Sequence, residues 1–329
     1  MAFGSDISSL SKTQKRELVN LLWPKSHLRQ HQHQLGSETV DATIAHVQFL
    51  RSHLSQPLSR IIADVSKGFL NIDKDSIQQL LELSVRIWLT INVNSPSIVI
   101  GPTMAHEMPL RWPQSISLAS LIGNQFTKDN AGMRSTKRTR LDRSFTASYL
   151  VNVCGMTLRW TDTLTDHLRS NASKETLIVY KHKICLVNHL EAATECPIPK
   201  DVLEEALDSL NLLFPFGDAS TKKLLAGEGL HEFYRLGNCG RERQLDVSRY
   251  EYWGNELDDL VELFRSPPRT WKQLATDRRN KLEWAAFWIT VMVAVLTLVS
   301  IPCNIIQATY SVKAYHATLA QDNNCPSSA

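Results

Sequence analysis

Three residues in one short segment could carry chemistry together. His182, Cys185 and His189 stand at positions i, i+3 and i+7, so they would share one face if residues 182–190 formed a helix. Imidazole and thiolate groups are common zinc ligands, and with a further cysteine or carboxylate nearby such a set could hold zinc. The spacing matches no standard zinc finger, however, and apolar residues stand between the three. We therefore expect no metal and no other cofactor.

Two further arrangements could support catalysis. Cys185 and His189 could form a nucleophile–base pair, although the fold normally brings such partners together. Asp162 and Asp166 would lie one helical turn apart and could share acid–base work, but such carboxylates more commonly cap helices or face solvent. The sequence contains no glycine-rich phosphate loop, no Gly-x-Ser-x-Gly elbow and no His-Glu-x-x-His motif. An enzyme is thus the alternative hypothesis, with a site assembled from distant residues and with the candidates Cys185, His182, His189 and Asp166.

The elements that would position these residues follow from the spacing of apolar side chains. In 73–92, Ile77, Leu81 and Val85 fall on one stripe, which predicts a buried helix. Apolar or alternating runs predict strands, and four prolines in 94–115 predict an irregular connection. The fold class we expect is α+β, rich in helices, with one or two small sheets. The other helices are expected at 38–54, 58–69, 144–154, 199–213 and 250–264, and the strands at 97–100, 156–160 and 176–180.

The composition limits the classes of protein to consider. Apolar residues make up 43% and charged residues 21% of the 329 residues, as in a globular protein and unlike a disordered one. A net charge of +3 is too small to indicate a nucleic-acid partner, so none is expected. The six cysteines are sparse and far apart, as in a reducing compartment. Residues 128–143 are rich in cations, and a solvated loop, a phosphorylated loop and a lipid contact are the alternatives.

A long uncharged segment lies near the C-terminus. No charged residue occurs from Trp284 to Val312, and residues 284–306 are mostly apolar. As a helix these 23 residues would extend roughly 34 Å, enough to cross a hydrocarbon layer about 30 Å thick. We therefore predict one transmembrane helix at 284–306. Pro302 cannot donate a backbone hydrogen bond and should kink the last third of this helix.

The residues that flank this segment predict its orientation. Trp284 and Trp288 stand at one end and Tyr310 near the other, as aromatic side chains do at the headgroup region. Only Lys313 follows the segment, whereas basic residues precede it, among them Arg278, Arg279 and Lys281. Since the side richer in Lys and Arg stays in the cytosol, the N-terminal region should face the cytosol. We expect no signal peptide ahead of it, and the short tail predicts insertion after translation, as in tail-anchored proteins.

These signals divide the chain into five segments. A soluble cytosolic region spans 37–265, with an optional subdivision near 115–143. The others are an N-terminal helix with a polar loop, a basic juxtamembrane segment, the transmembrane helix and a short lumenal or extracellular tail, at 1–36, 266–283, 284–306 and 307–329. An endomembrane, the endoplasmic reticulum, is expected in preference to the mitochondrial outer membrane.

Several stretches of the sequence occur in an order that is found elsewhere. They include LRWTDTLTDHL (158–168), RLGNCGRERQL (235–245), YEYWGNELDDLVELF (250–264) and WKQLATDRRNKLEWAAFW (271–288). This order is similar to that in a family of filamentous-fungal proteins of uncharacterised activity, in which a Trp-rich stretch with Asp-Arg-Arg-Asn leads into one C-terminal membrane helix. The resemblance covers most of 75–310. It implies a cytosolic region on a single membrane helix, and it assigns no catalytic residue.

Taken together, these observations favour a membrane-anchored protein whose cytosolic region is an interaction or regulatory module and not an enzyme. Its expected partners are the lipid bilayer and another protein, whose identity the sequence does not indicate.

Overall fold

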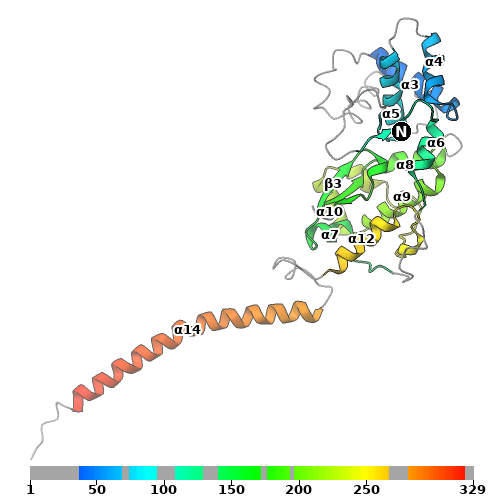
Figure 1. Ribbon diagram of the computed structural model, residues 1–329. Helices are drawn as coiled ribbons and strands as arrows, with labels where there is room; N and C mark the ends of the chain where they lie inside the picture. Colours follow the sequence, from blue (N-terminus) through cyan, green and yellow to red (C-terminus); the bar gives the residue numbers. More distant parts are fainter. Residues whose placement is uncertain are drawn as a thin grey trace, which may run out of the picture. The chain divides into compact units, whose positions relative to one another are not determined.

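The computed structural model describes residues 37–68, 74–94, 108–128, 140–171, 176–192, 196–266 and 281–322. The chain divides into two units, residues 1–266 and residues 267–329. Of the described elements, the first unit contains all the strands and every helix but one, and the second unit contains a single long helix (Figure 1).

The first unit contains a three-stranded sheet, in which β5 (Thr176–Tyr180) lies between β3 (Thr157–Thr161) and β4 (Ser170–Asn171). β5 runs parallel to β3, with Thr176 opposite Thr157, and antiparallel to β4. Every residue of β5 is buried, as expected of a central strand rich in apolar and β-branched residues. In β3, exposed residues alternate with partly buried ones, which is typical of an edge strand.

A second sheet pairs β1 (Val93–Asn94) with β2 (Leu110–Arg111) in parallel. A backbone hydrogen bond of 2.8 Å from the Leu110 N–H to the Asn92 carbonyl belongs to this pairing. The prediction of an irregular connection over 94–115 is wrong in part. Asn94 belongs to β1, and Leu110 and Arg111 form β2. Strands of two residues show no alternation of apolar side chains, so no periodic pattern could have indicated them.

Three helices pack together in the N-terminal portion of the unit: α3 (Ser37–Ser52), α4 (Leu58–Gly68) and α5 (Lys74–Leu89) (Figure 1). α5 buries Ile77 and Leu81 in the hydrophobic core, along the stripe that the sequence predicts.

The C-terminal half of the unit is built around α9 (Lys200–Leu213), which is buried along most of its length and packs against α8 (Lys183–Glu191). α12 (Gly254–Arg265) buries its apolar face in the same core. Shorter helices complete the unit: α6 (Leu118–Gln125), α7 (Ala147–Asn152), α10 (Ala219–Gly227) and α11 (His231–Arg235).

The prediction of a helix-rich region with small sheets is confirmed. The strands expected at 156–160 and 176–180 are β3 and β5, whereas the sequence did not predict α6, α10 or α11. The strand expected at 97–100, the N-terminal segment 1–36 and most of 128–143 lie outside the described residues.

The second unit contains α14 (Lys281–Asp322), a helix of 42 residues that includes Pro302. The predicted transmembrane helix at 284–306 lies inside α14, and the helix continues through residues 307–322, which the sequence assigned to the tail. At 1.5 Å per residue its length is about 63 Å, about twice the thickness of a hydrocarbon layer.

Candidate functional site

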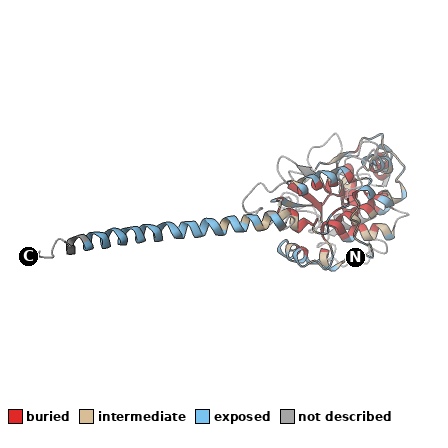
Figure 2. Cartoon of the chain, turned by 90° about the horizontal axis from the view of Figure 1, so that it is seen from below, coloured by how far each residue is buried: buried red, intermediate tan, exposed pale blue. Residues whose placement is uncertain are grey.

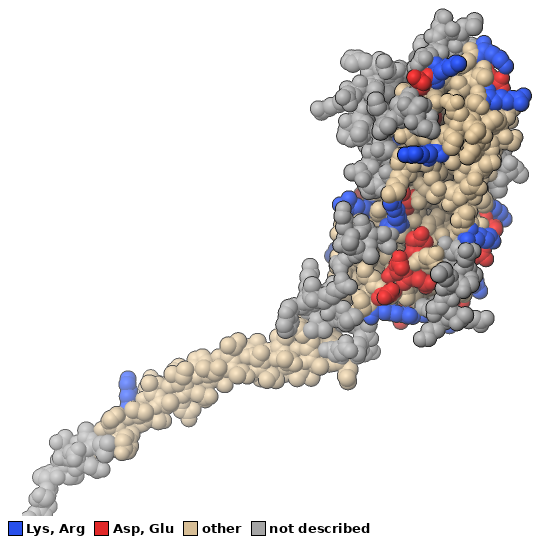
Figure 3. Space-filling model, viewed as in Figure 1, with Lys and Arg blue, Asp and Glu red and all other residues tan. Residues whose placement is uncertain are grey.

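The surface of α14 is apolar and exposed. Every residue from Met292 to Thr318 is exposed (Figure 2), and among the large apolar side chains Leu298 is 69% exposed and Ile305 62%. Lys313 is the only charged residue between Trp284 and Thr318, and Figure 3 shows an otherwise uncharged helix. This helix is long and apolar enough to cross a membrane.

Aromatic side chains mark the two ends of this surface. At one end the rings of Trp284 and Trp288 lie edge to face, with centroids 6.4 Å apart. Towards the other end, the side chains of Tyr310 and Tyr315 are exposed. From Trp288 to Tyr310 the helix rises about 33 Å, close to the thickness of a hydrocarbon layer. Pro302 lies between these ends, within continuous helix.

The basic residues predicted to fix the orientation lie at or just before the start of this helix. Arg278 and Arg279 lie outside the described residues, and Lys281 is the first residue of α14. Their effect on orientation stays a prediction.

In the first unit, polar side chains gather where β3 and β5 end. Asp162 directly follows β3, and Lys181 and His182 directly follow β5. Because these strands are parallel neighbours, Asp162 Oδ1 lies 2.5 Å from His182 Nε2 and 2.8 Å from Lys181 Nζ. Burial disfavours the charged carboxylate, but hydrogen bonds from His182 and Lys181 outweigh it and hold the pKa of Asp162 below its ordinary value. We call these three residues the strand-end cluster.

Cys185 lies in the first turn of α8, and its thiol is not activated. The side chain is buried, and this burial raises the pKa of the thiol to about 11. Its hydrogen-bonding neighbour is Tyr180, whose hydroxyl oxygen lies 2.6 Å from Thr90 Oγ1. A thiol that stays protonated at neutral pH is a poor nucleophile.

His189 and Asp166 have partners of their own. His189 is buried on α8 and hydrogen-bonds to the backbone of Trp88, and burial lowers its pKa to about 4. Asp166 lies in a short 3-10 turn, where its carboxylate is 3.2 Å from the guanidinium of Arg169. The three residues that were considered as zinc ligands therefore have different partners. Within the described ranges, no group of three or more His, Cys, Asp or Glu side chains could hold a metal ion.

A buried carboxylate that the sequence analysis missed organises the start of α12. Glu205 of α9 accepts hydrogen bonds from the backbone N–H groups of Glu251, Tyr252 and Trp253, at 2.6, 2.8 and 2.8 Å. These donors precede α12 and lie far from Glu205 in the sequence. The one signal for such a role is that Glu205 stands among the inward-facing apolar residues of α9.

A buried lysine joins α8 to α9 in a similar way. Lys183 is 2% exposed, and its ammonium group donates to Asn211 Oδ1 at 2.8 Å and to the Gly237 carbonyl at 2.5 Å. Burial lowers the pKa of Lys183. The ammonium group also lies 5.3 Å from the centre of the Phe233 ring, a favourable cation–π contact. These partners come from three segments, so sequence spacing could not reveal them.

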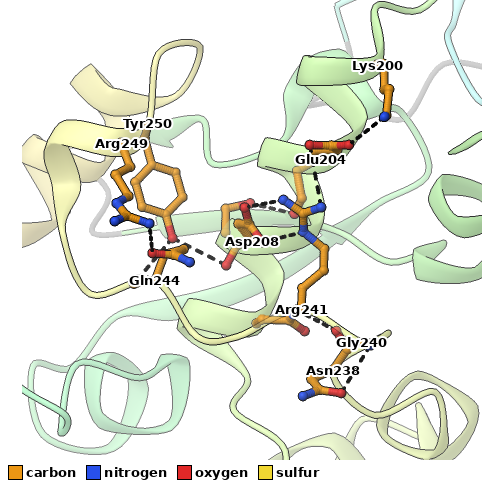
Figure 4. Close-up of polar contacts among 12 residues, drawn as sticks. Lys200, Glu204, Asp208, Asn238, Gly240, Arg241, Gln244, Arg249 and Tyr250 are labelled. Atoms are coloured by element: carbon orange, nitrogen blue, oxygen red, sulfur yellow. Dashed lines mark hydrogen bonds and ion pairs between the residues drawn. The ribbon is translucent and has the colours of Figure 1, made fainter.

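Figure 4 shows how the segment after α11 is attached to α9. Arg241 pairs with Asp208 through two hydrogen bonds, Nε to Oδ1 at 2.6 Å and Nη2 to Oδ2 at 2.7 Å. Glu204, one turn earlier on α9, lies 3.5 Å from Arg241 and 3.4 Å from Lys200. Each charge in this network has an opposite charge beside it, so the network holds residues 236–250 on α9 and gives no indication of catalysis.

No protein-family model, no curated protein and no solved structure matches the chain. The strongest functional features of the described residues are therefore geometric: the apolar surface of α14, and the strand-end cluster.

Proposed function

We propose that the protein is a single-pass, tail-anchored membrane protein and that residues 1–266 form a cytosolic interaction or regulatory module. The observation that carries the proposal is the exposed, uncharged surface of α14 between Trp284 and Val312. The endoplasmic reticulum is the favoured membrane. The resemblance to a filamentous-fungal family, which the sequence suggests, implies the same architecture.

Insertion of this helix is energetically favourable. Eleven of residues 284–306 are Leu, Ile, Val or Phe. At about 0.3 to 0.6 kcal/mol each, they favour the bilayer by roughly 3–7 kcal/mol. In water the same side chains would form an apolar patch larger than soluble monomers expose, which promotes aggregation. In a bilayer, lipid tails cover these apolar side chains.

Alkaline carbonate extraction tests the anchor. Full-length protein should stay in the membrane pellet, whereas a chain that ends at Ser266 should be found in the soluble fraction. Release of the full-length protein by carbonate would contradict the proposal.

The orientation rests on the cations at and just before the start of α14. Arg278, Arg279 and Lys281 should each gain about 1 kcal/mol next to anionic lipid on the cytosolic side. Changing all three to Glu should reduce the fraction of chains with a cytosolic N-terminus, and protease protection of sealed vesicles measures this fraction. A protected first unit in the wild type would show that the proposed orientation is wrong.

An exposed phenylalanine that packs on a partly buried tyrosine supports the interaction module. Phe216, just after α9, is 61% exposed, and its ring centre lies 5.3 Å from that of Tyr234. Aromatic side chains are typical anchors of protein interfaces. In proximity labelling from the full-length protein, Phe216→Ala should lose cytosolic partners that Met108→Ala keeps, because Met108 is also 61% exposed and serves as the matched control. Equal labelling by both variants would contradict a role for this surface.

A membrane-tethered enzyme is the second candidate, because of the strand-end cluster. Ligands commonly bind at the carboxyl ends of parallel strands, and a carboxylate that orients a histidine recurs in general-base catalysis. Asp162 and His182 have this relation. The interaction module ranks first because His182 is only 8% exposed and the Cys185 thiol is protonated. A hydrolase activity that is present in the wild type and lost in folded His182→Ala would reverse this order.

A further inference from the structure

Polar side chains lie along one face of the apolar helix α14. Between Ile289 and Val312 there are seven Ser, Thr, Asn and Gln residues, and all of them except Thr309 recur at intervals of three, four or seven. At 3.6 residues per turn, these six side chains occupy an arc of about 100°. We call this face the polar stripe, and it consists of Thr290, Thr297, Ser300, Asn304, Gln307 and Ser311.

The hydroxyl groups of the stripe are satisfied within the helix. Thr290 and Thr297 donate to the carbonyls of Ala286 and Val293, each at 2.8 Å, and Ser311 donates to the Gln307 carbonyl at 2.9 Å. The carboxamides of Asn304 and Gln307 differ, because none of the described residues hydrogen-bonds to either of them, and Asn304 is the one that lies farther from Tyr310. A carboxamide has two N–H donors and an oxygen with two lone pairs, so it needs several partners.

The carboxamide of Asn304 needs these partners most because it would lie inside the hydrocarbon layer. If Tyr310 lies at the membrane interface, Asn304 lies six residues, or about 9 Å, inside the hydrocarbon layer. No water is available there, and an unpaired polar group costs several kcal/mol. Polar side chains in this position normally hydrogen-bond to a neighbouring transmembrane helix.

We propose that the polar stripe is a self-association surface, on which α14 of a second copy packs in parallel with Asn304 paired to Asn304. This inference rests on the proposed membrane anchor. All copies of a tail-anchored chain insert in one direction, so identical residues lie at the same depth. A carboxamide is electrically self-complementary, since its N–H end fits the oxygen of an identical group. Spacings of three and four residues along the stripe suit the left-handed crossing of two parallel helices.

The main test uses purified full-length protein in phosphatidylcholine vesicles, with energy transfer measured between two labelled populations. Asn304→Leu should weaken self-association about tenfold, the scale of one to two hydrogen bonds between helices. Thr309→Leu is the matched control, because it also replaces a polar side chain but on the other face, and it should associate like the wild type. Asn304→Gln should keep most of the association, since it keeps the carboxamide.

Cysteine cross-linking in the same vesicles locates the interface. In a full-length background with Cys303 and Cys325 both changed to Ala, Ser300→Cys on the stripe should form a dimer on oxidation, whereas Leu298→Cys on the opposite face should not. Equal cross-linking at both positions, or equal energy transfer for Asn304→Leu and Thr309→Leu, would overturn the proposal. Transfer that is absent in pure vesicles but present in native membranes would indicate a different partner and would overturn it too. Carbonate extraction of each variant separates these outcomes from failure of the anchor, because all of them should remain in the membrane.

Discussion

Similar apolar residues meet opposite environments in the two units of the chain. In the first unit Leu81 and Leu207 are almost fully buried, whereas in α14 Leu298 is 69% and Ile305 62% exposed. A soluble core and a membrane anchor therefore differ here in burial more than in residue type. The apolar surface of α14 therefore needs a cover that its own unit does not supply within the described residues.

Polar groups show the same contrast. In the first unit the carboxylate of Glu205 receives three backbone N–H groups and the ammonium of Lys183 reaches two oxygen atoms. Buried charges need such partners, because an unpaired charge is costly away from water. In α14 hydroxyl groups donate to carbonyls of their own helix, as the Thr297 hydroxyl does to the Val293 carbonyl at 2.8 Å. Glu205 and Lys183 thus find their partners within the first unit, whereas α14 depends on its surroundings.

The largest expected effect of a substitution is the loss of membrane insertion. Leu296→Arg places a charge near the middle of the apolar segment, at a cost of about 3 kcal/mol, which cancels much of the gain from insertion. Tyr315→Arg carries the same charge near the end of the helix and should insert normally, since a long cation there can reach the interface. The carbonate-resistant fraction measures both variants. If the two variants behave alike, α14 is not embedded at the proposed depth.

The next largest effect concerns the buried carboxylate of Glu205 in the first unit. Glu205→Ala leaves three backbone N–H groups, of which that of Trp253 is buried, without their acceptor and should lower the free energy of unfolding by about 3 kcal/mol. Glu204→Ala is the matched control: its carboxylate is 32% exposed and pairs with Lys200 at the surface, so its loss should cost about 1 kcal/mol or less. Urea unfolding of the chain that ends at Ser266 compares the two, and equal losses would show that Glu205 is not a structural anchor.

An effect that is smaller for each side chain involved should follow from pH. His167 is buried, with its Nδ1 accepting from the Tyr180 N–H at 3.3 Å and its Nε2 lying 2.7 Å from Ser209 Oγ. Burial lowers the pKa of His167 to about 3 and that of His189 to about 4. In the unfolded chain both titrate near 6.5, so the unfolded state gains protons first as the pH falls. Stability should be complete above pH 6.5 and decrease steadily towards pH 4, by about 2 kcal/mol for each histidine at pH 5.

Urea unfolding of the first unit at pH 8 and pH 5 measures this loss. His189→Gln should reduce the dependence on pH by about half, and replacement of exposed His231 should leave it unchanged. A midpoint that is constant from pH 8 to pH 5 would contradict the buried neutral state of both histidines.

The sequence predicted those elements that bury a long periodic face. α5, α9 and β5 are examples, because their apolar residues repeat at the period of a helix or fill a whole strand. The sequence did not predict the short strands β1 and β2, since two residues are too few to show a periodic pattern.

The partners of individual polar residues could be predicted far less well. Asp162 and Asp166 are one turn apart only in a helix, but β3 continues to Thr161 and separates their environments. Asp162 instead meets His182, twenty residues later, because β3 and β5 lie side by side. Strand order is a long-range property that spacing within one segment does not contain.

The smallest expected effect concerns Cys185, because the reactivity of its thiol distinguishes a structural first unit from a catalytic one. Its thiol is buried, and its pKa is raised to about 11. Cys185 should therefore react slowly with a neutral alkylating reagent at pH 7.5, whereas the half-buried Cys239 in the same chain should react faster and serves as the internal control. Mass spectrometry of the folded protein over time measures both rates.

Cys185→Ala should lower the free energy of unfolding by only about 1 kcal/mol, because it removes one small buried side chain. It should leave partner labelling and membrane insertion unchanged, since Cys185 lies in the first unit and packs among core residues. Alkylation of Cys185 as fast as that of Cys239 would mean that solvent reaches the thiol and that it ionises near neutral pH. That result would move Cys185 and the adjacent strand-end cluster from the structural core to a reactive site, and the membrane-tethered enzyme would then become the better account of the first unit.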